Sequence, residues 1–320
     1  MPEADGPVAT ASPDVMVLPA EAVPVATESE VDQAGTRKLG AFGWFAMGWM
    51  ILVALMALVP WAFPVPAVDE RFRDPIINDS FGPQGSHIFG FDDSGFDMLS
   101  KVIYGARASM LVSVGAVLFG LLVGGFLGLI AGYFRGKLDA VLTSGFNVLL
   151  AMPQLVLALT LATVFASGTN ISYGRRVLVV TFAIGIVSIP ILGRITRANT
   201  LAWSQREFVL ASKVLGARTP RILWREVLPN VLPAMCSIAL LGIAVAIVVE
   251  GGLSLLGVGV PASIDSPSWG NLIATGRSQM LLGKPWVVFA PSIMVFLTVL
   301  SLNYLGDVVR ARFDVRDSAL

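Results

Sequence analysis

The sequence predicts an all-α membrane protein with six transmembrane helices, both termini in the cytoplasm, and a short cytoplasmic helix between the fourth and fifth spans. Hydrophobic residues make up 55% of the 320-residue chain and charged residues only 14%, with a mean hydropathy of +0.76. Six stretches reach or approach the ~20 apolar residues that cross a bilayer, and basic residues concentrate in alternate connections. A soluble fold would need more polar surface than this composition supplies.

The six apolar stretches differ in length, and the fourth is the least well defined. It reaches the length of a full span only if its polar flanks, residues 173–197, are included. Pro153, Pro190 and Pro291 lie inside or beside spans, where proline removes a hydrogen bond and bends a helix. In chain order the stretches cover about residues 42–63, 108–133, 141–166, 177–192, 231–258 and 286–305.

Lysine and arginine set the predicted orientation, because cytoplasmic connections of membrane proteins are enriched in both. Basic residues precede span one, follow span six, and occupy the connections after spans two and four, which places both termini inside. Arg175 and Arg176, before span four, are the exception. The basic residues of the predicted cytoplasmic segments are Arg37, Lys38, Arg135, Lys137, Arg194, Arg197, Arg206, Lys213, Arg218, Arg221, Arg225, Arg310, Arg312 and Arg316.

The chain divides into three predicted parts. Residues 1–36 are acidic and poor in aromatic residues, which indicates a disordered cytoplasmic tail rather than a secretory signal. Residues 37–107 hold the first transmembrane helix and an extracytoplasmic loop. Residues 108–320 hold the main transmembrane domain.

Few residues could carry chemistry. Cys236 is the only cysteine and His87 the only histidine, which excludes an intrachain disulfide and a metal site rich in either residue. We expect Cys236 to be a small packing residue and His87 to form hydrogen bonds in the outer loop. No catalytic group and no metal site is predicted, and the sequence has no Walker A motif. A net charge of zero indicates no nucleic acid partner.

The outer loop, predicted at residues 64–107, is rich in aspartate and too long for a simple turn. Asp92, Asp93 and Asp97 allow a calcium interpretation, but their spacing differs from the D-x-[DN]-x-[DN]-G pattern. We therefore favour a structural or docking role for this loop.

A stripe of glycines runs along the second span. Gly120, Gly124, Gly128 and Gly132 recur every four residues, with Ala116 one step earlier. Small residues on one face let the backbone of another helix approach closely. Since glycine is common in membrane helices, it is the strict spacing that favours close packing over chance.

Glu250, in IVVEGGLSLLG, is the one carboxylate deep in an apolar stretch. A carboxylate in lipid is costly, so it should face the bundle interior or an aqueous cavity, and Gly242 and Ala246 share its helical face. Two roles stay open: Glu250 lines a transport path, or it bonds loosened backbone at Gly251–Gly252. A catalytic role would need a second reactive group beside it.

The segment between spans four and five, residues 206–229, is the most distinctive. One face of a predicted helix is apolar, through Leu210, Ala211, Val214 and Leu215. Gly216 then permits the positive φ of a helix C-cap, and a second basic amphipathic segment follows until Pro229 stops it. Such a helix is suited to docking against a partner, and lying passively on lipid headgroups is the alternative.

This segment, REFVLASKVLGARTPRILWREVLPN, resembles the EAA loop of ABC importer permeases. In that family the loop forms a coupling helix seated in a groove of the ATPase subunit. Leu210 stands where the family often has glutamate, and Glu207 belongs to the flanking REF element. The residues that the resemblance assigns to coupling are Glu207, Leu210, the small pair Ala211 and Ser212, the family's glycine Gly216, its neighbour Ala217, and the closing proline Pro229.

Other fragments resemble the smaller of the two paired permeases of peptide importers. HIFGFDDSGFDMLSKVIYGARAS is similar to HPLGTDxxGRDxLSRxxYGARxS in that subfamily and departs from it at Ile88, Phe89, Phe91 and Phe96. Further similar fragments are GYFRGKLDAVLTSGFNVLLAMPQLVLAL, RITRAN, VEGGLSLLGVGV, PSWGNLI and NYLGDVVRARFDVR. Together they cover residues 87–316 in the family's order.

The resemblance implies an importer of dipeptides or oligopeptides in a bacterial plasma membrane. Such a permease works with a second permease, two ATPase subunits or one fused ATPase, and an extracytoplasmic binding protein. ATP and Mg are then bound by the ATPases, and this chain holds no cofactor and contacts membrane lipid. The same machinery importing nickel or glutathione is the alternative cargo. An ion-coupled secondary transporter and an intramembrane enzyme are the alternative classes.

Overall fold

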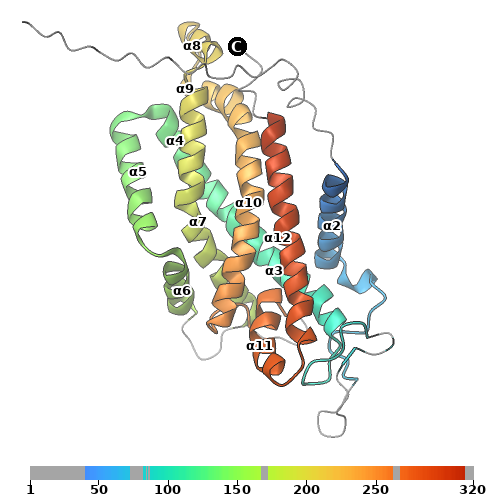
Figure 1. Ribbon diagram of the computed structural model, residues 1–320. Helices are drawn as coiled ribbons and strands as arrows, with labels where there is room; N and C mark the ends of the chain where they lie inside the picture. Colours follow the sequence, from blue (N-terminus) through green and yellow to red (C-terminus); the bar gives the residue numbers. More distant parts are fainter. Residues whose placement is uncertain are drawn as a thin grey trace, which may run out of the picture. The chain divides into compact units, whose positions relative to one another are not determined.

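The computed structural model is built from helices packed side by side (Figure 1). It describes residues 40–72, 82–83, 85, 87–166, 172–261 and 267–313, so the predicted acidic tail, residues 1–36, lies outside the described residues. Within these ranges there is no strand, and the only β-type pairs are two isolated bridges, Arg71 with Phe96 and Phe91 with Asp97. The predicted all-α class is confirmed.

Five helical stretches are long and apolar enough to cross a membrane, and a sixth crossing forms if the bent pair α5–α6 is one span. The bend between these two helices is 86°. In chain order the helices are α2 (Ala41–Leu58), η1 (Pro60–Ala62), α3 (Met98–Gly120), η2 (Leu121–Gly125), α4 (Phe126–Phe134), α5 (Gly136–Ala151), α6 (Gln154–Phe165), α7 (Tyr173–Trp203), α8 (Glu207–Val214), α9 (Thr219–Ile222), η3 (Leu223–Val227), α10 (Leu228–Leu255), α11 (Trp269–Leu281) and α12 (Trp286–Phe313).

One predicted boundary is wrong, and one predicted span is bent. The outer loop ends at Asp97 instead of continuing to residue 107, because the Asp97 carboxylate caps α3 by accepting a hydrogen bond from the Ser100 N–H at 2.8 Å. The third predicted span is broken, because Pro153 donates no backbone hydrogen bond and holds Met152 in an extended conformation (φ −85°, ψ 138°). The fourth span, α7, has 31 residues and includes the polar flanks.

The four glycines of the stripe lie against α7. A Cβ on Gly120 would be 2.8 Å from the Ser188 Cβ, and one on Gly132 would be 2.6 Å from the Arg197 carbonyl oxygen. On Gly124 and Gly128 a Cβ would overlap carbonyl oxygens of α7. A four-residue spacing overshoots a 3.6-residue turn by about 40°, and the wider π-helical turn η2 counteracts that drift. The glycines therefore stay on one face.

Two polar contacts join α5 to α7. The Arg197 guanidinium donates to both oxygens of Asp139, with 2.7 Å from Nη2 to Oδ2. Arg194 Nη2 donates to Asn147 Oδ1 at 2.8 Å. Both side-chain contacts involve α5. Helix α6 also packs on α7, with Leu157, Ala158 and Leu159 in a shared apolar cluster.

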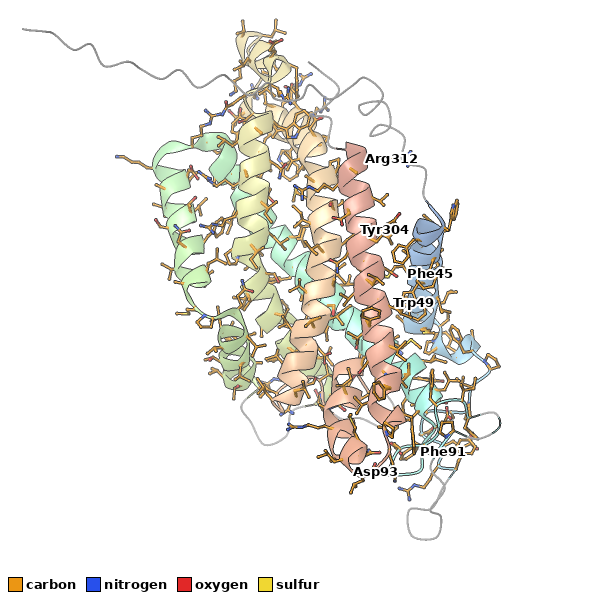
Figure 2. All side chains as sticks on the ribbon, viewed as in Figure 1. Phe45, Trp49, Phe91, Asp93, Tyr304 and Arg312 are labelled. Atoms are coloured by element: carbon orange, nitrogen blue, oxygen red, sulfur yellow. The ribbon has the colours of Figure 1, made fainter. Side chains whose placement is uncertain are left out.

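Helix α2 packs along α12. The Trp49 indole donates to Thr298 Oγ1 at 3.1 Å, and Phe42 meets Tyr304 edge to face with 4.8 Å between ring centroids. Figure 2 shows Phe45 and Trp49 on the α2 side nearest α12. Helix α2 also contacts α3, and the residues that remain exposed on α2 are apolar.

We predict that Gly128→Ala destabilises the bundle by at least about 1–3 kcal/mol, because the methyl group overlaps the α7 backbone and neither helix can give way cheaply. The midpoint of thermal unfolding in detergent measures this loss. Gly145→Ala on α5 is the matched control, since a Cβ there meets nothing within 4 Å. Equal midpoints for the two variants would contradict the packing account.

Candidate functional site: the segment between α7 and α10

Helix α8 is attached to the bundle through one buried side chain. Val209 is fully buried in a cluster with Leu129 of α4, Ile222 of α9 and Val227 of η3. Trp203, at the end of α7, packs against the same cluster, and its ring lies tilted against that of Phe208, with 6.3 Å between ring centroids. The fold thus holds α8 at the end of the bundle opposite α11 (Figure 1).

The predicted apolar face of α8 points outward. Leu210 is 50% exposed, Val214 88% and Leu215 86%, and Ala211 is exposed beside them. We call these four residues the outer face of α8. Large apolar side chains this exposed are costly in water, so the outer face is suited to contact with another surface. Periodicity alone had identified this face but not Val209, whose burial depends on α4 and α9.

A glycine turn ends α8. Gly216 has φ +77°, its N–H donates to Lys213 O at 3.0 Å, and the Ala217 N–H donates to Ser212 O at 3.0 Å. This pair of bonds is a Schellman motif. The turn lets the chain reverse at once into α9, and a side chain at this position would be strained by the left-handed backbone.

Pro229 does not stop the helix, and that prediction is wrong. Helices α9, η3 and α10 form one continuous stretch, Thr219–Leu255. Pro229 lies in the first turn of α10, directly after the π-helical turn η3. Proline has no backbone N–H to donate, and its position is where the hydrogen-bond pattern changes from π-helical to α-helical. The backbone therefore runs without a break from α9 to the far end of α10.

Glu250 lies near that far end and is fully buried. Its Oε1 accepts hydrogen bonds from Ser254 Oγ at 2.9 Å and Ser268 Oγ at 2.8 Å. Ser268 also caps α11, because its Oγ accepts from the Asn271 N–H at 3.0 Å. Glu250 thus faces the interior and joins α10 to the start of α11. By a rise of 1.5 Å per residue it lies about 33 Å along α10 from Leu228.

Helix α11 was not predicted as an element, because its 13 residues are too few and too polar to read as a span. The sequence signal for the start of this helix is Ser268, because serine is a favoured N-cap residue and stands directly before Trp269. Trp269 is fully buried, its backbone N–H donates to Ser109 Oγ at 2.9 Å, and its indole N–H donates to the Val102 carbonyl at 2.8 Å. The start of α11 is therefore fixed to α3 as well as to α10.

The outer loop packs beside α11. Asp92 pairs with Lys101, and Asp97 accepts from the His87 ring at 2.8 Å, so His87 is a hydrogen-bonding residue as predicted. The Asp93 N–H donates to Gln279 of α11 at 3.0 Å, and Figure 2 places Asp93 and Phe91 at this end. No three acidic, histidine or cysteine side chains gather as a metal site in the described part of the chain.

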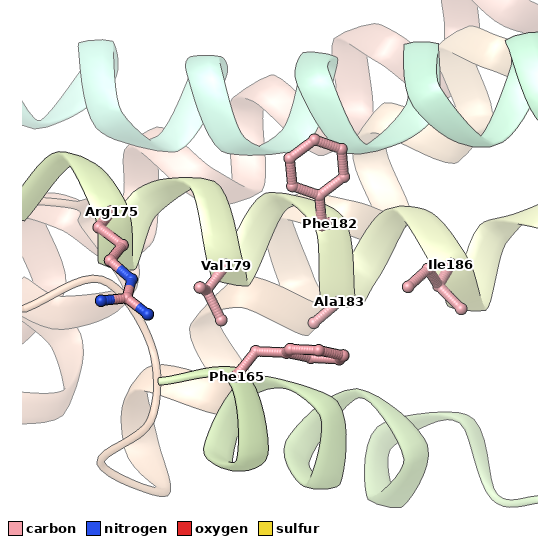
Figure 3. Close-up of a pocket in the computed structure, with 6 residues that line it drawn as sticks. All are labelled: Phe165, Arg175, Val179, Phe182, Ala183 and Ile186. Atoms are coloured by element: carbon pink, nitrogen blue, oxygen red, sulfur yellow. The ribbon is translucent and has the colours of Figure 1, made fainter. Parts of the chain in front are cut away.

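Cys236 differs from the expectation, and Arg175 had no predicted role. Cys236 is exposed on α10, so it does not pack inside this chain as expected. Arg175, the exception in the charge pattern, lies at a hollow of about 340 Å³ between α6 and α7 (Figure 3). The other lining residues are apolar: Phe165, Val179, Phe182, Ala183 and Ile186.

Comparison with known proteins identifies relatives over most of the chain. The family described as "Binding-protein-dependent transport system inner membrane component" matches residues 124–316, more than half of the chain. The dipeptide transport system permease protein DppC of Alkalihalophilus pseudofirmus is 32% identical over 88% of this chain and 87% of its own. The glutathione transport system permease protein GsiD of Pectobacterium atrosepticum is 33% identical over 83% of this chain and 84% of its own.

A solved structure shares the fold. A chain of the MetNI methionine ABC transporter, in an inward-facing conformation, superposes with a TM-score of 0.54. It is 18% identical, and the match covers 67% of this chain and 97% of that one. At this identity the likeness concerns the arrangement of helices alone.

We predict that Glu250→Ala loosens α11, because two hydroxyl groups lose a buried acceptor at a cost of about 1–3 kcal/mol. Amide hydrogen exchange across residues 269–281 should then accelerate roughly ten- to hundredfold if local opening controls it. Glu250→Gln keeps an oxygen acceptor and should exchange nearly as slowly as the unmodified chain. Equal exchange in the alanine variant would remove Glu250 from the attachment of α11.

Proposed function

We propose that the chain, which belongs to the family of binding-protein-dependent transport system inner membrane components, forms half of the pore of an ATP-driven importer of peptides. It is a multi-pass protein of the bacterial inner membrane. The names of relatives that match most of the chain, among them dipeptide and oligopeptide permeases, support peptides as cargo. The main observation in favour of coupling to an ATPase is the exposed outer face of α8.

The proposed topology has six spans with both termini in the cytoplasm. The end of the bundle that bears α8 is rich in basic residues, which supports a cytoplasmic position for that end. These residues include Arg135, Lys137, Arg206, Lys213, Arg218, Arg221 and Arg225. The end with α11 holds Asp92, Asp93 and Asp97 and would face outward.

The outer face of α8 would dock on an ATPase subunit. Leu210 replaces the glutamate that the related loop often carries, so apolar contact and the small residues Ala211 and Ser212 would supply the fit. Ala217, next to the glycine turn, packs against the Val209 cluster, and Glu207 and Pro229 flank the docking helix. ATP and Mg would be bound by the ATPases.

Further partners complete the proposed importer. A second, related permease would form the other half of the pore, two ATPase subunits or one fused ATPase would supply the energy, and an extracytoplasmic binding protein would deliver the cargo. The chain would also contact membrane lipid, and no nucleic acid takes part. This chain itself performs no hydrolysis in the proposed mechanism.

The continuous stretch from α9 to α10 suggests how movement would cross the membrane. A displacement of α8 would pass through the short Gly216 turn into Thr219–Leu255, whose far end holds Glu250 and, through Ser268, the start of α11. ATPase closure would thereby reach the extracytoplasmic end without a flexible joint in the described backbone between them.

Two alternatives concern cargo and class. Nickel or glutathione would use the same machinery, and the relative named a glutathione permease is as similar to this chain as the dipeptide permease. An ion-coupled secondary transporter would need an accessible ionisable group near mid-membrane. Glu250 is fully buried and bonded to two serines, which favours a structural role over ion coupling.

We predict that Leu215→Glu weakens ATPase docking. A buried leucine contributes about 1.5–3 kcal/mol, so placing a charge there should lower the affinity at least about tenfold. Co-purification of the ATPase with the membrane complex measures the loss. Leu281→Glu is the matched control, because Leu281 is equally exposed at the opposite end, on α11. ATPase retention in both variants would refute docking at this face.

A second test concerns the glycine turn. Gly216→Arg should insert normally yet lose ATP-dependent peptide uptake, because the left-handed turn is strained and a bulky group is added beside the docking helix. Gly216→Ala isolates the strain, which is about 1–2 kcal/mol, and should lose less activity. Full uptake by the arginine variant would exclude this turn from coupling.

A further inference from the structure

The bend between α5 and α6 is an exposed break in a membrane-spanning segment. Residues 151–156, which we call the elbow, are all exposed, and Met152 is 49% exposed. Sixteen residues of α5 precede the break and twelve of α6 follow it, so the elbow lies far from both ends of the span.

The elbow leaves backbone donors unpaired. The first hydrogen bond of α6 runs from the Leu157 N–H to the Pro153 carbonyl at 3.0 Å. The N–H groups of Gln154, Leu155 and Val156 have no acceptor among the described residues, and no side chain caps the helix. Each such group costs several kcal/mol in hydrocarbon. Irregular backbone at membrane depth is therefore found where protein covers it or where it faces a water-filled cavity.

Polar side chains share the exposed surface of α5 and α6. Ser144, Asn147 and Gln154 are exposed, and Ser144 and Gln154 have no hydrogen-bond partner in the described part of the chain. The opposite edge of the bundle differs: the exposed residues of α2, such as Trp44 and Ile51, are all apolar. Lipid suits the α2 surface and does not suit the elbow.

We infer that the elbow lines the water-filled path of the cargo, opposite the second permease, while α2 faces lipid. This inference rests on the proposed function, because it assigns the pore side of the same importer. Water, and the polar backbone of a passing peptide, would satisfy the free N–H groups. The hollow with Arg175 lies farther along the same span, between the end of α6 and α7 (Figure 3).

Cysteine accessibility tests this assignment. Cys236 is the only cysteine, so Cys236→Ser gives a background without reactive thiols in this chain. Met152→Cys and Gln154→Cys are compared with Ile51→Cys on α2, whose parent side chain is 56% exposed against 49% for Met152. The chain is expressed with its native partners in membrane vesicles. A charged, membrane-impermeant methanethiosulfonate and a lipid-soluble maleimide are applied in parallel.

The elbow cysteines should react with the charged reagent at least about tenfold faster than the α2 cysteine, because thiolates form in water and not in hydrocarbon. The α2 cysteine should react with the maleimide only. Elbow cysteines that react only with the maleimide would place the elbow in lipid, and elbow cysteines that react with neither would place it under a partner chain; both results overturn the inference.

Transport by the Cys236→Ser variant tests the proposed function separately from the elbow. Its ATP-dependent uptake of a labelled dipeptide reports on the importer alone, since no elbow residue is changed. Absent uptake with reactive elbow cysteines would reject the peptide importer and keep the aqueous path. Normal uptake with unreactive elbow cysteines would keep the peptide importer and reject the aqueous path.

Discussion

The contact between the glycines of α3–α4 and the backbone of α7 positions the rest of the bundle. Lipid supplies no hydrophobic force between helices, so close packing must hold them together. Without side chains at Gly124 and Gly128, carbonyl groups of α7 reach the facing backbone. Helix α7 then contacts α3, α4, α5, α6 and α10. The segment that carries α8 follows directly after the end of α7, and the α5–α6 pair packs against α7.

The sequence predicted the features that depend on local pattern. Apolar stretches placed the spans, the glycine spacing indicated a packing face, and Gly216 indicated a turn with positive φ. It did not predict which side of α8 is buried. Helical periodicity selects Leu210 and Leu215 as one face, but Val209 is buried by residues of α4 and α9 that are distant in sequence.

The bend at Pro153 shows the same limit. Proline marks the position, yet the size of the bend depends on α7, which holds α5 through Asp139–Arg197 and Asn147–Arg194 and holds α6 by apolar contact. Helix α11 was missed for another reason. Its 13 residues carry no span-length apolar signal, and its position is set by Glu250 and Trp269 through contacts with α10 and α3.

These attachments join the end of the bundle that bears α8 to its central helices. The π-helical turn η3 could bend freely if it were exposed, but Leu223 and Val227 are buried against Leu129 of α4. Helix α4 is in turn packed on α7. In the proposed importer, a displacement of α8 would therefore move α4, α7 and α10 together. The break at Pro153 separates α6 from the two side-chain contacts between α5 and α7. In the proposed importer, relative movement of the pore wall would then be concentrated at the elbow, where the backbone already lacks its helical hydrogen bonds.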